Sequence, residues 1–245
     1  MKPFADYHTH TKCSDGKGTV EENVLAARKR GLRELGIADH GPAGLFVGVK
    51  RAETLLKVKK LTRECNEKYP DICVKAGVEA NILNIEGKLD VPQKILKELD
   101  QVLVGFHLQI FSPTFKGMKE IVFDNFWTKL VKKDRASLRL RNNNTKASVE
   151  AVLRNSVNIF THPGLHISID TKELARACAK KETALEINCR HVEEAREFVD
   201  VGIKEGACFV ISSDAHRPED VGNLEKGIKV VEDLKIPPEL VLNLE

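Results

Sequence analysis

The chain has 245 residues, of which 42% are hydrophobic and 31% charged, and its formal net charge at pH 7 is +3. Single α/β barrels commonly reach this size, so we expect one domain over residues 1–245. This net charge is too small to indicate by itself a surface for binding nucleic acid. No apolar run approaches the length of a membrane span, and the N-terminus lacks a secretory signal pattern, so we expect no membrane partner.

Six cysteines are scattered singly, and none forms a Cys-x-x-Cys pair. This spacing favours neither a disulfide framework nor a thiolate zinc site. The sequence therefore predicts a soluble protein in the reducing cytoplasm.

The first apolar run leads into two histidines, His8 and His10. In an extended segment side chains alternate faces, so both point the same way and can bind one cation together. Taken alone, the pair is better explained by chance composition. The next expected elements are a helix over 20–30 with a capping box at Thr19 and Glu22, a strand over 34–38, a helix over 52–68, a strand over 72–78, a hairpin over 82–87, a helix over 92–99 and a strand over 101–106.

Residues 108–158 contain the only tryptophan and a basic stretch over 129–146. Their pattern predicts a helix over 116–131 and another over 147–155, capped by Asn144 or Thr145. After these we expect a strand over 158–161, a helix from 170 or 171 to 181, a strand over 184–188, a helix over 192–205, a strand over 208–212 and a last helix. Such alternation of strands and helices is typical of an α/β fold with a parallel sheet.

All but the sixth of the seven expected strands are followed at once by a histidine or a carboxylate. In a closed α/β barrel the carboxyl ends of all strands meet at one mouth, so these scattered positions would converge. Each residue alone is more often an ordinary hydrogen-bonded group at a strand end. The set is His8 and His10, Asp39 and His40, Glu79, His107, His162, and Asp214 with His216.

So many imidazoles in one place have no structural use without a cation. Imidazole with carboxylate is the ligand set of zinc, manganese or iron, whereas magnesium and calcium sites are dominated by oxygen. An open catalytic site has about three protein ligands per ion. We therefore predict two or three divalent transition metal ions, with zinc favoured over manganese and iron, and with carboxylates bridging.

These residues resemble the PHP (polymerase and histidinol phosphatase) superfamily, and the likeness extends over residues 5–217. Within the superfamily the chain is similar to stand-alone bacterial phosphatases of the YcdX type and to the PHP domain of bacterial family X DNA polymerases, through residues 184–188 and 236–243. The matching motifs are His8-Thr9-His10 with Ser14-Asp15-Gly16, Ala38-Asp39-His40, Gly77-Val78-Glu79, Gly105-Phe106-His107, Thr161-His162-Pro163 and Ser213-Asp214-Ala215-His216.

The resemblance implies a distorted (βα)7 TIM-like barrel with the metal site at the C-terminal ends of the strands. It implies one ion held by His8, His10, Glu79 and Asp214, a second held by Glu79, His107 and His162, and a third held by His40 and His216. Some members have a histidine where this chain has Asp15. That residue is therefore either a further ligand or a turn residue before Gly16.

A polynuclear site suits phosphoester hydrolysis by a metal-activated hydroxide, without a covalent enzyme intermediate. We predict Glu79, Asp214 and His216 as the catalytic residues. Arg190, Arg217 and Lys17 are candidates to hold the phosphate, and for each the alternative is a solvated surface charge. The cysteines are interpreted as bystanders, because none has a motif that marks a nucleophile.

Two functions remain open from the sequence. The first is a phosphatase of small phosphorylated molecules, with histidinol phosphate as one candidate. The alternative is a 3′-5′ exonuclease or nucleotide phosphodiesterase, for which the basic stretch would follow the phosphate backbone, unless it is only a solvated helix face. A third hypothesis is a non-catalytic metal-binding interaction module, but the full set of ligands argues against a loss of activity. The stretch runs from Lys129 to Lys146, and the basic residues inside it are Lys132, Lys133, Arg135, Arg139 and Arg141.

Overall fold

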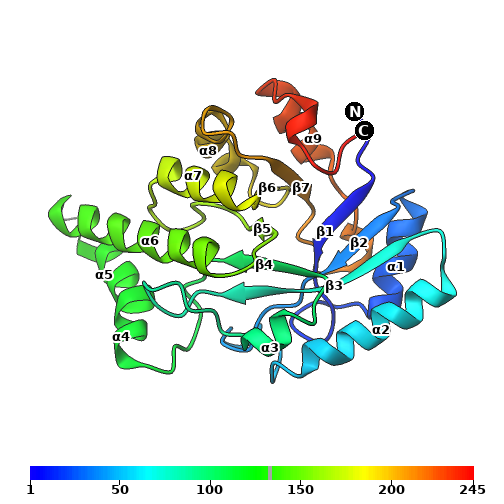
Figure 1. The fold of residues 1–245 in the computed structure, drawn as a ribbon, viewed down its shortest axis with the longest axis horizontal. Coiled ribbons are helices and arrows are strands. Elements are labelled where there is room, and N and C mark those ends of the chain that lie inside the picture. Colours follow the sequence, from blue (N-terminus) through cyan, green and yellow to red (C-terminus); the bar gives the residue numbers. More distant parts are fainter. Residues whose placement is uncertain (132–133) are drawn as a thin grey trace.

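The computed structural model describes residues 1–131 and 134–245. Within them seven parallel strands are hydrogen-bonded in the order of the sequence, which makes a barrel with helices around it (Figure 1). The predicted α/β class and TIM-like barrel are therefore confirmed. The strands are β1 Ala5–Thr9, β2 Glu34–Ile37, β3 Cys73–Asn81, β4 Gln101–Gly105, β5 Ile159–Phe160, β6 Ala184–Asn188 and β7 Phe209–Ser212.

The helices pack on the outside of the strands. The capping box predicted for α1 is present, since Thr19 Oγ1 accepts from the Glu22 amide and Glu22 Oε2 accepts from the Thr19 amide. The helices are α1 Val20–Lys29, α2 Thr54–Lys68, α3 Gln93–Leu96, α4 Phe115–Gly117, a π-helical segment Met118–Phe123, α5 Asp124–Val131, α6 Asp134–Arg154, α7 Thr171–Lys181, α8 Val192–Lys204 and α9 Glu225–Asp233, with single 3₁₀ turns at Pro218–Asp220 and Pro238–Leu240.

The prediction for α6 was wrong at its start, because Asn144 and Thr145 lie inside the helix and do not cap it. Asn144 is buried, and its side chain exchanges hydrogen bonds of 2.9 Å with Asn125 on α5. Thr145 Oγ1 donates to the Arg141 carbonyl and accepts from the Asp170 amide, both at 2.7 Å. Tertiary hydrogen bonds thus satisfy side chains whose local preference is for a cap.

The first and last strands meet along a seam with two different ends. Near the carboxyl ends a parallel bridge joins Thr9 to Ala215. Near the amino ends the chain's C-terminal tail fills the seam, and the two termini lie side by side (Figure 1). Buried Asn243 donates to the carbonyls of Ala5 and Ile211 and accepts from the Ile211 amide.

The barrel interior has its own small apolar cluster. It joins residues from five strands or strand ends that contact one another across the barrel: Ala38, Leu103, Ile159, Ala184 and Val210. A larger cluster packs the outer faces of the strands against helices α2 and α6–α9. This filled interior leaves the carboxyl ends of the strands as the place where polar side chains gather.

Candidate metal centre

Glu79 lies at the middle of the polar cluster at the barrel mouth. Its carboxylate is almost completely buried on β3. One oxygen, Oε1, lies 2.8 Å from His162 Nε2 and 3.3 Å from His107 Nε2. The other, Oε2, lies 2.9 Å from His40 Nδ1 and 3.3 Å from His8 Nε2. The two oxygens of one carboxylate therefore face two separate groups of histidines.

The first group combines the ends of β1 and β7. His8 and His10 point the same way, as expected, with their Nε2 atoms 3.0 Å apart. Asp214 Oδ1 lies 3.3 Å from His10 Nε2 and 3.8 Å from His8 Nε2. Asp214 reaches this place with a left-handed backbone, φ 53°.

The second group combines the ends of β4 and β5. His107 Nε2 and His162 Nε2 are 3.3 Å apart, with Glu79 Oε1 between them. His162 also has a positive φ, 31°, and such strained conformations are most frequent at functional sites.

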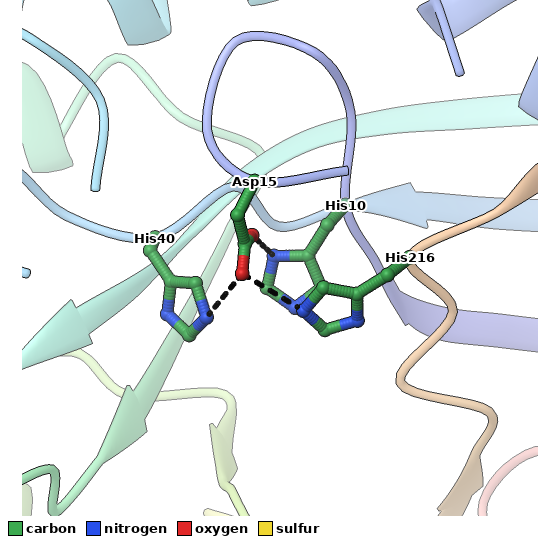
Figure 2. A group of neighbouring side chains, drawn as sticks. All are labelled: His10, Asp15, His40 and His216. Atoms are coloured by element: carbon green, nitrogen blue, oxygen red, sulfur yellow. Dashed lines mark ion pairs between the residues drawn. The ribbon is translucent and has the colours of Figure 1, made fainter. Parts of the chain in front are cut away.

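The third group gathers around Asp15, which the first loop carries into the mouth between the histidines (Figure 2). Its Oδ2 atom lies 3.2 Å from His216 Nε2 and 4.0 Å from His40 Nε2, and its Oδ1 atom lies 3.9 Å from His10 Nδ1. Asp15 is therefore part of the cluster and does more than form a turn.

The spacing of these atoms fits divalent metal ions. Two nitrogens bound tetrahedrally to one zinc ion, at about 2.05 Å each, are separated by about 3.3 Å. The separations of the Nε2 atoms, 3.0 Å for His8 and His10 and 3.3 Å for His107 and His162, lie close to this value. In addition, His10 Nδ1 is buried without a hydrogen-bond partner among the described residues. Such lone pairs are costly unless a cation binds them.

The protonation states suit the same role. Burial and the adjacent His40 lower the pKa of His10 to about 3, and burial also lowers the pKa of His107. Burial opposes ionisation of Glu79, but His8, His107 and His40 outweigh it and hold the pKa of Glu79 well below its usual range. His10 and His107 are thus neutral and Glu79 is ionised, the forms that bind metals. Burial opposes protonation of the other four histidines, but nearby carboxylates outweigh it and raise the pKa values of His8, His40, His162 and His216, so a metal ion would displace protons from them.

Glu186 belongs to the cluster and was missed from the sequence. It is buried on β6, and its Oε1 accepts a 2.7 Å hydrogen bond from His8 Nδ1, while Oε2 accepts from the His162 amide at 2.8 Å. Asn81 plays the corresponding part for His107, with a 2.7 Å hydrogen bond from His107 Nδ1 to Asn81 Oδ1. Both contacts leave Nε2 facing the cluster.

Asp39 follows β2 as predicted, but it does not join the ligand groups. It is fully buried and accepts hydrogen bonds from the amide and hydroxyl of Thr11, both at 2.7 Å, and from Ser14 Oγ at 2.5 Å. Asp39 therefore holds the loop that carries Asp15.

A cavity of about 250 Å³ opens next to Asp214 and His216. Arg190 lies at this boundary, with Nη1 2.8 Å from His216 Nδ1 and 3.8 Å from Asp214 Oδ1. The residues that line the cavity are Cys189, Arg190, Ser213, Asp214, His216, Arg217, Asp220, Asn223 and Lys226. The predicted Arg190 and Arg217 are included, and Asn223 and Lys226 are additions that sequence reasoning missed.

The other predicted residues lie as follows. Lys17 is exposed and does not line this cavity, although its amide donates to the His216 carbonyl at 2.7 Å. Burial raises the pKa of Cys189 to about 12 and also raises that of Cys13, so both thiols stay protonated. This supports the interpretation of both cysteines as bystanders.

The structure describes only part of the basic stretch over residues 129–146. Lys132 and Lys133 lie outside the described residues. Arg141 is bound within the fold, donating to Asp170 Oδ2 at 2.8 Å and to the Ile169 carbonyl. Arg139 is exposed. Across the part of the chain that the structure describes, no helix is long and apolar enough to span a membrane.

The chain is similar to known proteins along nearly its whole length. A probable phosphatase of Caldanaerobacter subterraneus subsp. tengcongensis is 32% identical over 253 residues, which covers 99% of this chain and 88% of that protein. Probable phosphatase YcdX of Escherichia coli K12 is 27% identical over 249 residues, covering 98% and 89%. The crystal structure of histidinol phosphate phosphatase from Lactococcus lactis, complexed with zinc, L-histidinol and phosphate, matches with a TM-score of 0.57.

That structural match covers 94% of this chain and 93% of the other, at 17% identity, so it supports the fold alone. The family model for the PHP domain matches residues 6–190. This segment includes all the residues of the cluster except Asp214 and His216, which the structure brings to the same mouth. The chain belongs to the PHP domain family.

Proposed function

We propose that this protein is a metal-dependent phosphatase that hydrolyses small phosphomonoesters at a site of two or three divalent ions, zinc being favoured. One observation carries the proposal: Glu79 Oε1 faces His107 and His162, whereas Glu79 Oε2 faces His8 and His40. A carboxylate in this position holds two ions close together, the arrangement used for hydrolysis of phosphate esters. The names of the curated relatives, probable phosphatases, support the same reaction.

The proposed ligands follow the geometry. One ion would be held by His8, His10, Glu79 and Asp214, a second by Glu79, His107 and His162, and a third by Asp15, His40 and His216. When bound, such ions lower the pKa of water and neutralise charge on the phosphoryl oxygens. Glu79, Asp214 and His216 are the proposed catalytic residues, because each would bind an ion and each lies at the mouth of the barrel.

The residues of the chain orient the substrate and the cluster. Arg190 lies within 3.8 Å of Asp214 and next to His216, where a guanidinium can donate two hydrogen bonds to a phosphoryl group. Arg217 lines the same cavity, and Lys17 lies on the loop behind His216. We propose these three cations as the substrate-binding residues, with Arg190 nearest to the reacting group.

A substrate screen tests this function. Protein treated with chelator and reconstituted with zinc or manganese is assayed on p-nitrophenyl phosphate, histidinol phosphate and short single-stranded DNA. We expect metal-dependent release of phosphate from monoesters and no degradation of DNA. Degradation of DNA without phosphatase activity would instead establish the nuclease alternative.

A pair of histidine variants shows whether the cluster performs the reaction. His107→Ala removes a proposed ligand, and we expect it to abolish most of the phosphatase activity. His166→Ala is the matched control, because His166 is exposed and lies outside the ligand groups. Equal activity of the two variants would show that the assignment of this site is wrong.

A further inference from the structure

The cavity beside the proposed metal cluster is lined partly by residues that are not proposed metal ligands. Asp214 and His216 form its inner wall, and Arg190 stands between the cluster and the open volume. The outer wall consists of Arg217, Asn223 and Lys226, from the segment that leads from β7 into α9. A volume of about 250 Å³ leaves room for a small organic group next to the phosphate.

The charge of the outer wall is positive. Lys226 has no hydrogen bond or ion pair in the described part of the chain, and Arg217 has only a 3.9 Å contact with Glu219, in which both side chains are more than 60% exposed. Exposed pairs of this kind contribute little, so Arg217 remains available to a ligand. Asp220 is the one carboxylate of the lining outside the metal cluster. Two cations thus face one anion.

Metal ions and Arg190 already neutralise the reacting phosphate of the proposed reaction, so the outer cations have no partner in a simple phosphomonoester. We infer that the natural substrate carries a second anionic group, a carboxylate or a second phosphate, which binds to Arg217 and Lys226 while the scissile phosphate lies on the metal cluster. Asn223 supplies an uncharged donor in the same wall. This inference rests on the proposed phosphatase function and narrows its substrate class.

The same wall disfavours substrates whose alcohol part is cationic. Histidinol phosphate carries an ammonium group near its phosphate, and that charge would approach Arg217 and Lys226. Like charges placed together in a binding site reduce the affinity for the wrong partner. The cavity therefore argues for substrates of opposite charge to histidinol.

Three phosphomonoesters of similar size isolate this effect: 3-aminopropyl phosphate, glycerol 3-phosphate and 3-phosphoglycerate. Their second groups are cationic, neutral and anionic. With metal-reconstituted protein we expect kcat/KM to rise in that order, by about tenfold from glycerol 3-phosphate to 3-phosphoglycerate. Lys226→Gln should reduce this ratio to about threefold or less, with little change for glycerol 3-phosphate.

Lys229→Gln is the matched control, because Lys229 is an exposed lysine on the same helix that does not line the cavity. It should keep the full preference for 3-phosphoglycerate. Equal kcat/KM for the three esters, or an equal loss of preference in both lysine variants, would overturn the inference while leaving the phosphatase function intact. If the protein hydrolysed none of the three esters and no p-nitrophenyl phosphate, the proposed phosphatase function itself would be wrong.

Discussion

The two ends of the seam between β1 and β7 use buried polar groups in opposite ways. At the amino end, Asn243 is completely buried, and its amide makes three hydrogen bonds of 2.7–3.0 Å to β1 and β7. At the carboxyl end, His8 and His10 are equally buried, but their Nε2 atoms face each other at 3.0 Å, and His10 Nδ1 lacks a hydrogen-bond partner in the described chain.

The difference is consistent with the proposal that the amino end stabilises the fold and the carboxyl end binds metal ions. Satisfied amide groups stabilise the closed barrel without any other molecule. Facing imidazole nitrogens and the positive φ of Asp214 are unfavourable, and a bound cation would offset their cost. Changes at the mouth should therefore act mainly on metal binding and activity, and changes at the amino end mainly on stability.

The largest effect on activity is expected from Glu79→Gln. The amide cannot serve both groups of histidines as an anion, so we expect a loss of phosphatase activity of about 10³-fold or more, with reduced metal content. Glu34→Gln is the control, since Glu34 is a carboxylate at the amino end of β2 that binds Tyr7 and Lys75. Steady-state kinetics and elemental analysis check both. Comparable losses in the two variants would remove the distinction between the ends of the barrel.

The counterpart at the amino end is Asn243→Ala. It leaves buried backbone groups of Ala5 and Ile211 without partners, so we expect the free energy of unfolding to fall by about 3 kcal/mol. Denaturant titration measures this change, and metal content at low temperature should remain that of the original protein. A stable variant that loses metal would contradict the structural role of this end.

A smaller effect is expected from Glu186→Gln, which keeps the shape of the side chain but replaces the charged acceptor of the His8 hydrogen bond. Such supporting carboxylates usually contribute 10–100-fold to metal affinity, so we expect a loss of about that size. Competition with a chromophoric chelator measures it, and Glu186→Asp should recover part of the affinity. Unchanged affinity in Glu186→Gln would show that Glu186 only fills space.

Much of the mouth could be predicted from the sequence, because its residues come directly after apolar runs, where parallel strands end. Glu186 was missed because it lies inside a strand, two residues before its end. The sequence does contain a signal for Glu186. It is the only carboxylate in the strand Ala184–Asn188, and the alternation of a strand places its side chain on the same face as that of Asn188.

Other features could not be read locally. Asn144 resembled a helix cap, and only its contact with Asn125, 19 residues away, shows why it stays helical. Arg217 was recognised from its nearness to the Asp214 motif, whereas Lys226 approaches the site only because α9 folds back over the end of β7. Contacts of this kind depend on tertiary packing and have no local pattern.

We propose that the mouth holds a cluster of metal ions and that His8 and His10 bind one of them. Elemental analysis of the metal-reconstituted protein and of the His8→Ala/His10→Ala double variant, with phosphatase activity measured on the same samples, tests it most directly. We expect at least two ions per chain in the original protein, and one ion fewer in the variant together with loss of activity. Full metal content in the double variant, or an original protein that takes up no metal, would contradict the proposed role of His8 and His10.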